Sequence, residues 1–195
     1  TAGGDITVNV TTNRDCKTYI AGIAGYMEKT ICSVSGTAHT ESATFKQGIN
    51  KGDISVSGGK YNANNVFYIA GVVAQTNSNK ITSTSHGWAD CNSNYGNITI
   101  NSPAKLCVGG VIGTLNAAAG SGHSGNTERC KYQGTMTVTN PGAGSCIGGI
   151  VGKYGRGQLG NANGFGESDS KLGKIIVTGA DATTYVGGYA GYLYT

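Results

Sequence analysis

Apolar and polar residues alternate in five short segments along the chain, and each segment opens with a glycine. The segments are GDITV at 4–8, GDISV at 52–56, GNITI at 96–100, GTMTV at 134–138 and GKIIV at 173–177. Alternation is typical of a β-strand that buries one face. The residues that we expect to point into the core are Ile6, Val8, Ile54, Val56, Ile98, Ile100, Met136, Val138, Ile175 and Val177.

A second, more apolar motif follows each of these segments. It reads YIAGIAG at 19–25, YIAGVVA at 68–74, CVGGVIG at 107–113, CIGGIVG at 146–152 and YVGGYAG at 185–191. Apolar residues occupy both the odd and the even positions of the motif, so it predicts one strand that is covered on both faces. Its glycines predict a close approach of neighbouring backbones. A shorter element, CNSNY at 91–95 and CKYQ at 130–133, precedes the next opening glycine.

The two motifs recur together, so the chain is built from repeats. The opening glycines are 48, 44, 38 and 39 residues apart, and the second motifs begin 49, 39, 39 and 39 residues apart. Units of this length bury their apolar faces by stacking on one another. No segment shows an apolar stripe at helical spacing.

The sequence therefore predicts an all-β fold, a right-handed β-solenoid of about five imperfect repeats with roughly three strands each. The expected repeats lie near 4–51, 52–95, 96–133, 134–172 and 173–195, within a single domain spanning 1–195. The repeat register at both ends is compatible with a piece of a longer array. The alternative is a β-sandwich or β-prism, in which the same strands pair antiparallel.

Composition narrows the class of protein. The 195 residues include 34 glycines but only 2 prolines, which argues against collagen-like and proline-rich disordered chains. The net charge of +4 comes from scattered lysines and arginines, so we expect no nucleic-acid partner. No apolar stretch is long enough to predict a transmembrane segment in this chain.

The six cysteines share two spacings. Cys16–Cys32, Cys91–Cys107 and Cys130–Cys146 are each 16 residues apart, whereas Cys91–Cys130 and Cys107–Cys146 are each 39 apart. The cysteines thus predict either three local disulfides or bridges between stacked repeats, and the local set is favoured because one spacing accounts for all six. Disulfides would indicate an oxidising compartment. Unbridged, the cysteines would be small buried residues, and their spacing does not match a zinc site.

Candidate catalytic groups are sparse. Only Asp5 and Asp53 share a repeat position among the acidic residues, and the following copies carry Asn97, Thr135 and Lys174 there. This arrangement gives little support to a pair of catalytic carboxylates. The three histidines fall in predicted loops, and no serine lies in a nucleophile-elbow motif. We therefore expect no catalytic residue, no metal and no cofactor.

Aromatic residues offer a different possibility. Tyr19, Tyr68 and Tyr185 occupy one repeat position, which Cys107 and Cys146 take in the other copies. Ladder packing is the ordinary interpretation of such a column.

A sugar-binding interpretation uses a partly different set of aromatic residues. Trp88, in a predicted loop, would form a candidate ligand platform with Tyr185 and Tyr189.

The unit G-[DN]-I-T-V followed by [YC]-[VI]-G-G-[IV]-[VI]-G resembles the GLUG-type repeat of bacterial cell-surface proteins. The resemblance is clearest over 96–152, while Ala21, Ala70 and Ala74 replace motif glycines in the first two copies. It implies an extracellular or cell-surface location, as in adhesin-like proteins of gut Bacteroidetes. It also implies an adhesion or scaffold role, toward a host or bacterial surface glycan or protein, and supplies no catalytic residues.

The function expected from these observations is that of a non-catalytic extracellular or cell-surface repeat module, an adhesin-like scaffold or stalk. One alternative is a carbohydrate-binding module that uses the aromatic platform. Another is a β-solenoid enzyme that degrades glycans.

Overall fold

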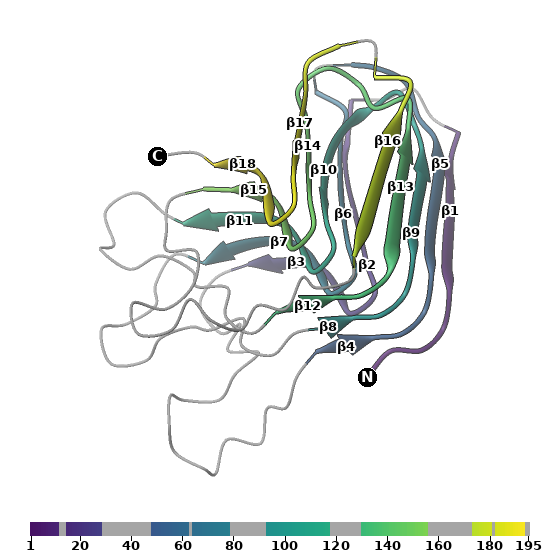
Figure 1. Cartoon of the computed structure of the whole chain (residues 1–195). Coiled ribbons are helices and arrows are strands. Elements are labelled where there is room, and N and C mark those ends of the chain that lie inside the picture. Colours follow the sequence, from purple (N-terminus) through teal and green to yellow (C-terminus); the bar gives the residue numbers. More distant parts are fainter. Residues whose placement is uncertain are drawn as a thin grey trace.

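The described part of the protein is built from parallel β-sheets (Figure 1). The computed structural model describes residues 1–11, 15–28, 48–62, 64–78, 93–117, 130–155, 173–180 and 182–193. Within these ranges there is no helix, and every strand pair is parallel. The all-β prediction is confirmed, and the arrangement is solenoid-like. Among the described strands, the antiparallel pairing of the alternative fold is not observed.

The alternating motif forms the first sheet. Its strands, in spatial order, are β1 (Ile6–Val10), β5 (Ile54–Gly58), β9 (Ile98–Asn101), β13 (Thr135–Thr139) and β16 (Lys174–Thr178). Equivalent motif residues are direct neighbours, because Ile6 pairs with Ile54, Ile54 with Ile98 and so on to Ile175. The repeat read from the sequence is therefore also the register of the sheet.

The second motif forms two strands where one was predicted. The second sheet contains β2 (Lys17–Ala21), β6 (Val66–Ala70), β10 (Lys105–Gly109), β14 (Ser145–Gly148) and β17 (Thr184–Gly187). The third sheet contains β3 (Ala24–Glu28), β7 (Val73–Ser78), β11 (Ile112–Ala117), β15 (Val151–Tyr154) and β18 (Ala190–Leu193). The chain bends sharply between them, so the prediction of one continuous strand was wrong.

Glycine makes this bend possible. A Cβ atom on Gly109 would overlap the carbonyl oxygen of Ile112, only three residues further along. Gly148 stands in the same relation to Val151. A side chain at this position would therefore push the two strands of one motif apart, and glycine lets them meet closely.

The third sequence element forms a small sheet of very short strands. These are β4 (Ile49–Asn50), β8 (Ser93–Asn94) and β12 (Lys131–Tyr132). The strands at one level of all the sheets are called a layer below. The N-terminal end layer contains β1, β2 and β3, and the C-terminal end layer contains β16, β17 and β18.

The core lies between the first, second and small sheets and includes residues of the third sheet, such as Ile112 and Val151. The predicted inward residues of the first sheet are buried in the middle layers, with Ile98 and Val138 fully inaccessible to solvent. Ile6, Val8, Ile175 and Val177, in the two end layers, are partly buried and pack against the same core. The inward prediction for this motif is confirmed.

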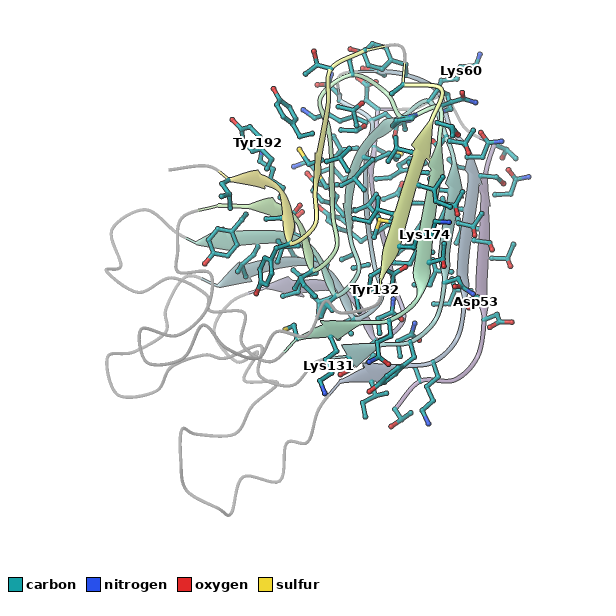
Figure 2. The ribbon with its side chains drawn as sticks, in the orientation of Figure 1. Asp53, Lys60, Lys131, Tyr132, Lys174 and Tyr192 are labelled. Atoms are coloured by element: carbon teal, nitrogen blue, oxygen red, sulfur yellow. The ribbon has the colours of Figure 1, made fainter. Side chains whose placement is uncertain are left out.

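The shared Asp5 and Asp53 position has a structural role. The Asp5 carboxylate accepts a hydrogen bond from the backbone N–H of Asp53 at 2.8 Å, and Asp53 accepts one from the N–H of Asn97 at 2.7 Å. The Asn97 side chain continues the series by accepting the N–H of Thr135 at 2.9 Å. Asp53 lies on the outer side of the first sheet (Figure 2). The column thus joins layers along the surface.

Buried asparagines join layers from inside. The Asn50 side chain donates to the Asn94 side-chain oxygen at 2.9 Å, and that oxygen also accepts the N–H of Gly96 at 3.0 Å. Tyr132 occupies the equivalent position in the next layer. A Cβ atom on Gly71 would overlap the side chain of Asn94, and one on Gly110 would overlap the ring of Tyr132. This second glycine of the motif therefore makes room for the small sheet.

Replacement of Gly110 by alanine, which adds a single methyl group, tests how closely the layers are stacked. Gly110→Ala should lower the free energy of unfolding by about 1–3 kcal/mol, because its Cβ would overlap both Tyr132 and the carbonyl oxygen of Gly149. Gly188→Ala, at the same repeat position in the C-terminal end layer, is the matched control, since nothing lies within 4 Å of its Cβ. Urea unfolding of the purified monomers measures both. Equal losses in the two variants would contradict the packing described here.

Candidate functional site

The outer faces of the second and third sheets meet along the line where the chain bends. One column on the second sheet is called the tyrosine–cysteine ladder. It consists of Tyr19, Tyr68, Cys107, Cys146 and Tyr185, which are in-register neighbours on successive strands. The residue after each ladder member, such as Val108 or Ile147, belongs to the core. Because side chains alternate along a strand, the ladder points away from the core.

A second column, on the third sheet, faces the ladder. We call it the facing column. It consists of five residues that are also in register on successive strands: Tyr26, Gln75, Thr114, Lys153 and Tyr192. The ring centroids of Tyr19 and Tyr26 are 5.1 Å apart, and those of Tyr185 and Tyr192 are 4.9 Å apart. Figure 2 shows Tyr192 on β18, on the side toward the second sheet. The two columns are therefore in contact at both ends.

The ends of this site are aromatic and accessible. Tyr26 is 40% exposed and Tyr185 is 41% exposed. Tyr19 also stacks on Tyr68, with centroids 5.0 Å apart and planes 13° from parallel. At the other end, the ammonium of Lys153 lies 5.9 Å from the centroid of the Tyr192 ring, at the outer limit of a cation–π contact. Both ends thus present tyrosine rings and hydroxyls to a partner.

The centre of the site is a buried pair of thiols. Cys107 and Cys146 are direct neighbours on adjacent strands and are 2% and 4% exposed. A hydrogen bond from the Cys146 thiol is the strongest influence on Cys107 and lowers the pKa of Cys107, against the effect of burial. The positive charges of Lys153 and Lys105 lower that pKa further. The same hydrogen bond, together with burial, raises the pKa of Cys146.

Tyr68, next to the thiols, is held in its neutral form. Burial is the main cause, and interaction with Cys107 and Tyr19 adds to it, so the pKa of Tyr68 rises to about 12. Around neutral pH its hydroxyl is therefore a hydrogen-bond donor and acceptor without charge.

The structure does not form the predicted local disulfides. Cys16, Cys107 and Cys146 carry free thiols, which leaves none of the three 16-residue bridges in place. The reason is clearest for Cys130 and Cys146. Cys130 is packed in the core, whereas Cys146 is on the outer face of the second sheet, so a strand lies between their side chains. Cys32 and Cys91 lie outside the described residues.

The structure separates the members of the predicted ligand platform. Tyr185 belongs to the ladder and is exposed, whereas Tyr189 lies at the bend between β17 and β18 and packs against the core. Trp88 lies outside the described residues. Sequence reasoning missed the facing column altogether. The available signal was a constant spacing, since each member follows its ladder partner by seven residues, as Tyr26 follows Tyr19 and Tyr192 follows Tyr185.

The site offers tyrosine binding groups and a pair of adjacent thiols. Tyrosine hydroxyls and rings suit a neutral ligand that is rich in hydroxyl groups, and two adjacent thiols suit reversible disulfide formation. Among the described residues, no group of His, Cys, Asp and Glu side chains is arranged to hold a metal ion. The same part of the chain contains no helix that could cross a membrane.

Comparison with protein-family models, with curated proteins and with solved structures found no match to this chain.

The register of the ladder makes a specific prediction about cysteine pairing. Oxidation by a small disulfide such as oxidised glutathione should join Cys107 to Cys146, because in-register neighbours on adjacent strands lie within the Cα separation that a disulfide requires. In this step the two thiols lose two protons and two electrons, and the oxidant is reduced to two thiols.

A non-reducing peptide map reads the result. The linked Cys107–Cys146 peptide should appear in the oxidised wild-type protein and vanish in Cys146→Ser. A map that instead links Cys130 to Cys146 would show that the ladder register described here is incorrect.

Proposed function

We propose that this chain is a right-handed β-solenoid of five repeats that serves as a non-catalytic scaffold or stalk in an extracellular or cell-surface protein. In this role it is adhesin-like and similar to GLUG-type repeat proteins of bacterial surfaces. Its partner is a surface glycan or protein of a host or of other bacteria. The observation that carries the proposal is the residue-for-residue stacking of the repeats through parallel sheets.

Stacking of this kind suits a spacer. Each layer is joined to the next by backbone hydrogen bonds in the three large sheets, and the Asp5, Asp53 and Asn97 side chains add bonds between the first four layers on the surface. Because each repeat contacts only its neighbours, the length of such a stack is set by the number of repeats. The outward positions vary from layer to layer without altering the core.

Surface exposure in the source organism tests this function. An antibody raised against the folded chain should label intact cells, and mild protease treatment of those cells should remove the label. Labelling that requires permeabilised cells would overturn the proposed location. A cytosolic marker protein serves as the control for cell integrity.

A second candidate function is carbohydrate binding, and the exposed tyrosine pairs favour it. Tyr19 with Tyr26, and Tyr185 with Tyr192, each combine a tilted ring pair with phenolic hydroxyls. Tyrosine has an apolar face that can cover a sugar ring and a hydroxyl that can bond to it.

Glycan-array binding distinguishes this candidate from a passive stalk. The double variant Tyr26→Ala, Tyr192→Ala should bind its best glycan about tenfold more weakly, the equivalent of about 1.4 kcal/mol. Tyr61→Ala is the control, because Tyr61 is 57% exposed and lies away from both columns, between β5 and β6. If the wild-type chain binds no glycan, or if all variants bind equally, the tyrosine pairs are not a sugar site.

A further inference from the structure

Among the described residues, no strand lies beyond either end of the stack. β1, β2 and β3 form one edge of the three large sheets, and β16, β17 and β18 form the other. Some positions that are buried in the middle layers are exposed there. Val186 is 51% exposed although its neighbour Ile147 is fully buried, and Ile23 is 46% exposed although its neighbour Val72 is 1% exposed. Each end therefore presents apolar side chains beside strand edges to which no further strand of the described residues is paired.

We propose that the C-terminal end layer of one copy stacks on the N-terminal end layer of a second copy, head to tail, so that the parallel sheets continue from one molecule into the next. This interaction goes beyond the proposed scaffold role, because it makes the chain a self-assembling unit. The contact is heterologous, since two different surfaces meet. Repetition of it produces open-ended filaments.

The apolar residues of the two ends are complementary in register. Continuing the sheets by one step places Ile175 next to Ile6, Val177 next to Val8 and Val186 next to Ile20, which is 6% exposed. Inside the chain the same positions bring together Ile54 with Ile98, or Ile69 with Val108. The intermolecular step thus repeats the packing that already forms the core.

Charge favours this orientation over others. The outer column of the first sheet begins with the exposed carboxylate of Asp5 and ends with the exposed ammonium of Lys174, which Figure 2 shows on the strand at the C-terminal edge. Head-to-tail stacking places these opposite charges side by side. A tail-to-tail contact would instead bring two Lys174 side chains to the same interface. Complementary charge therefore selects the parallel, head-to-tail arrangement.

The tyrosine pairs match in the same way. Stacking places Tyr185 next to Tyr19 and Tyr192 next to Tyr26. Within the chain, Tyr19 and Tyr68 already make this kind of contact, with nearly parallel rings whose centroids are 5.0 Å apart. The first and last repeats both carry tyrosines in these columns, whereas the third and fourth carry Cys107 and Cys146. Apart from Tyr68 in the second repeat, the tyrosines of the two columns thus occur where the two molecules meet.

Two end glycines provide a test that leaves the monomer intact. Inside the stack, a Cβ on Gly110 or Gly149 would overlap the carbonyl oxygen of the next layer, and a Cβ on Gly52 would overlap that of the preceding layer. Gly188 and Gly4 occupy these two positions in the end layers, and nothing lies within 4 Å of their Cβ positions. Alanine there is therefore tolerated in one molecule but collides with a stacked second one.

The experiment compares Gly188→Ala, Gly4→Ala and the wild-type chain by sedimentation velocity, with electron microscopy of the largest species. The wild type should form oligomers that grow with concentration, and each variant should remain monomeric with an unchanged unfolding midpoint. Gly3→Ala is the matched control. A Cβ on Gly3 is also unobstructed. Lys51 occupies the same position in the next layer and its side chain points into solvent, so a side chain at Gly3 should leave assembly unaffected.

A mixture of the two variants identifies the geometry. Gly188→Ala keeps a functional N-terminal end and Gly4→Ala keeps a functional C-terminal end, so an equimolar mixture should form dimers and nothing larger. A wild-type chain that stays monomeric at every concentration, a mixture without dimers, or variants that assemble like the wild type would each overturn the proposal. These outcomes are independent of whether the protein is found at a cell surface.

Discussion

The close approach of one backbone to the next is the constraint on which the structure depends. Parallel strands lie about 4.8 Å apart, and the glycines of the motif stand where a methyl group would strike a carbonyl oxygen or a buried side chain of a neighbouring strand. Removal of this space would affect the bend between the second and third sheets and the fit of the small sheet together. Glycine is therefore frequent here because of contacts between strands and layers, with a positive φ at only four of the described glycines.

Polar side chains reinforce the same stacking from two sides. On the solvent-exposed face of the first sheet, backbone N–H groups are accepted by the side chains of Asp5, Asp53 and Asn97. In the buried interior, the Asn50 side chain donates to the Asn94 side-chain oxygen, which also accepts the N–H of Gly96. The outer column of the first sheet continues from Asn97 to Thr135 and Lys174, where these side-chain bonds end. The asparagine series ends at Tyr132. The repeats are thus alike in the contacts that join layers and different in the groups that they present outward.

The outer columns of the second and third sheets are where this freedom is used. Tyrosines occupy the ends of the ladder, and a buried thiol pair occupies its centre, on the same backbone frame. The frame supports a scaffold role, the exposed rings support contact with a ligand, and the complementary end layers support assembly into filaments.

The sequence alone determined the repeat, the all-β class and the inward face of the first sheet, because alternation and spacing are local properties of the chain. Only the tertiary structure decided that the second motif bends into two strands, that Cys146 and Cys130 lie on different sides of a sheet, and that Tyr19 meets Tyr26. The physical reason is that side-chain pairing depends on which face each strand turns outward after the bend. That bend is set by contacts between strands, which the spacing of residues along the chain does not specify.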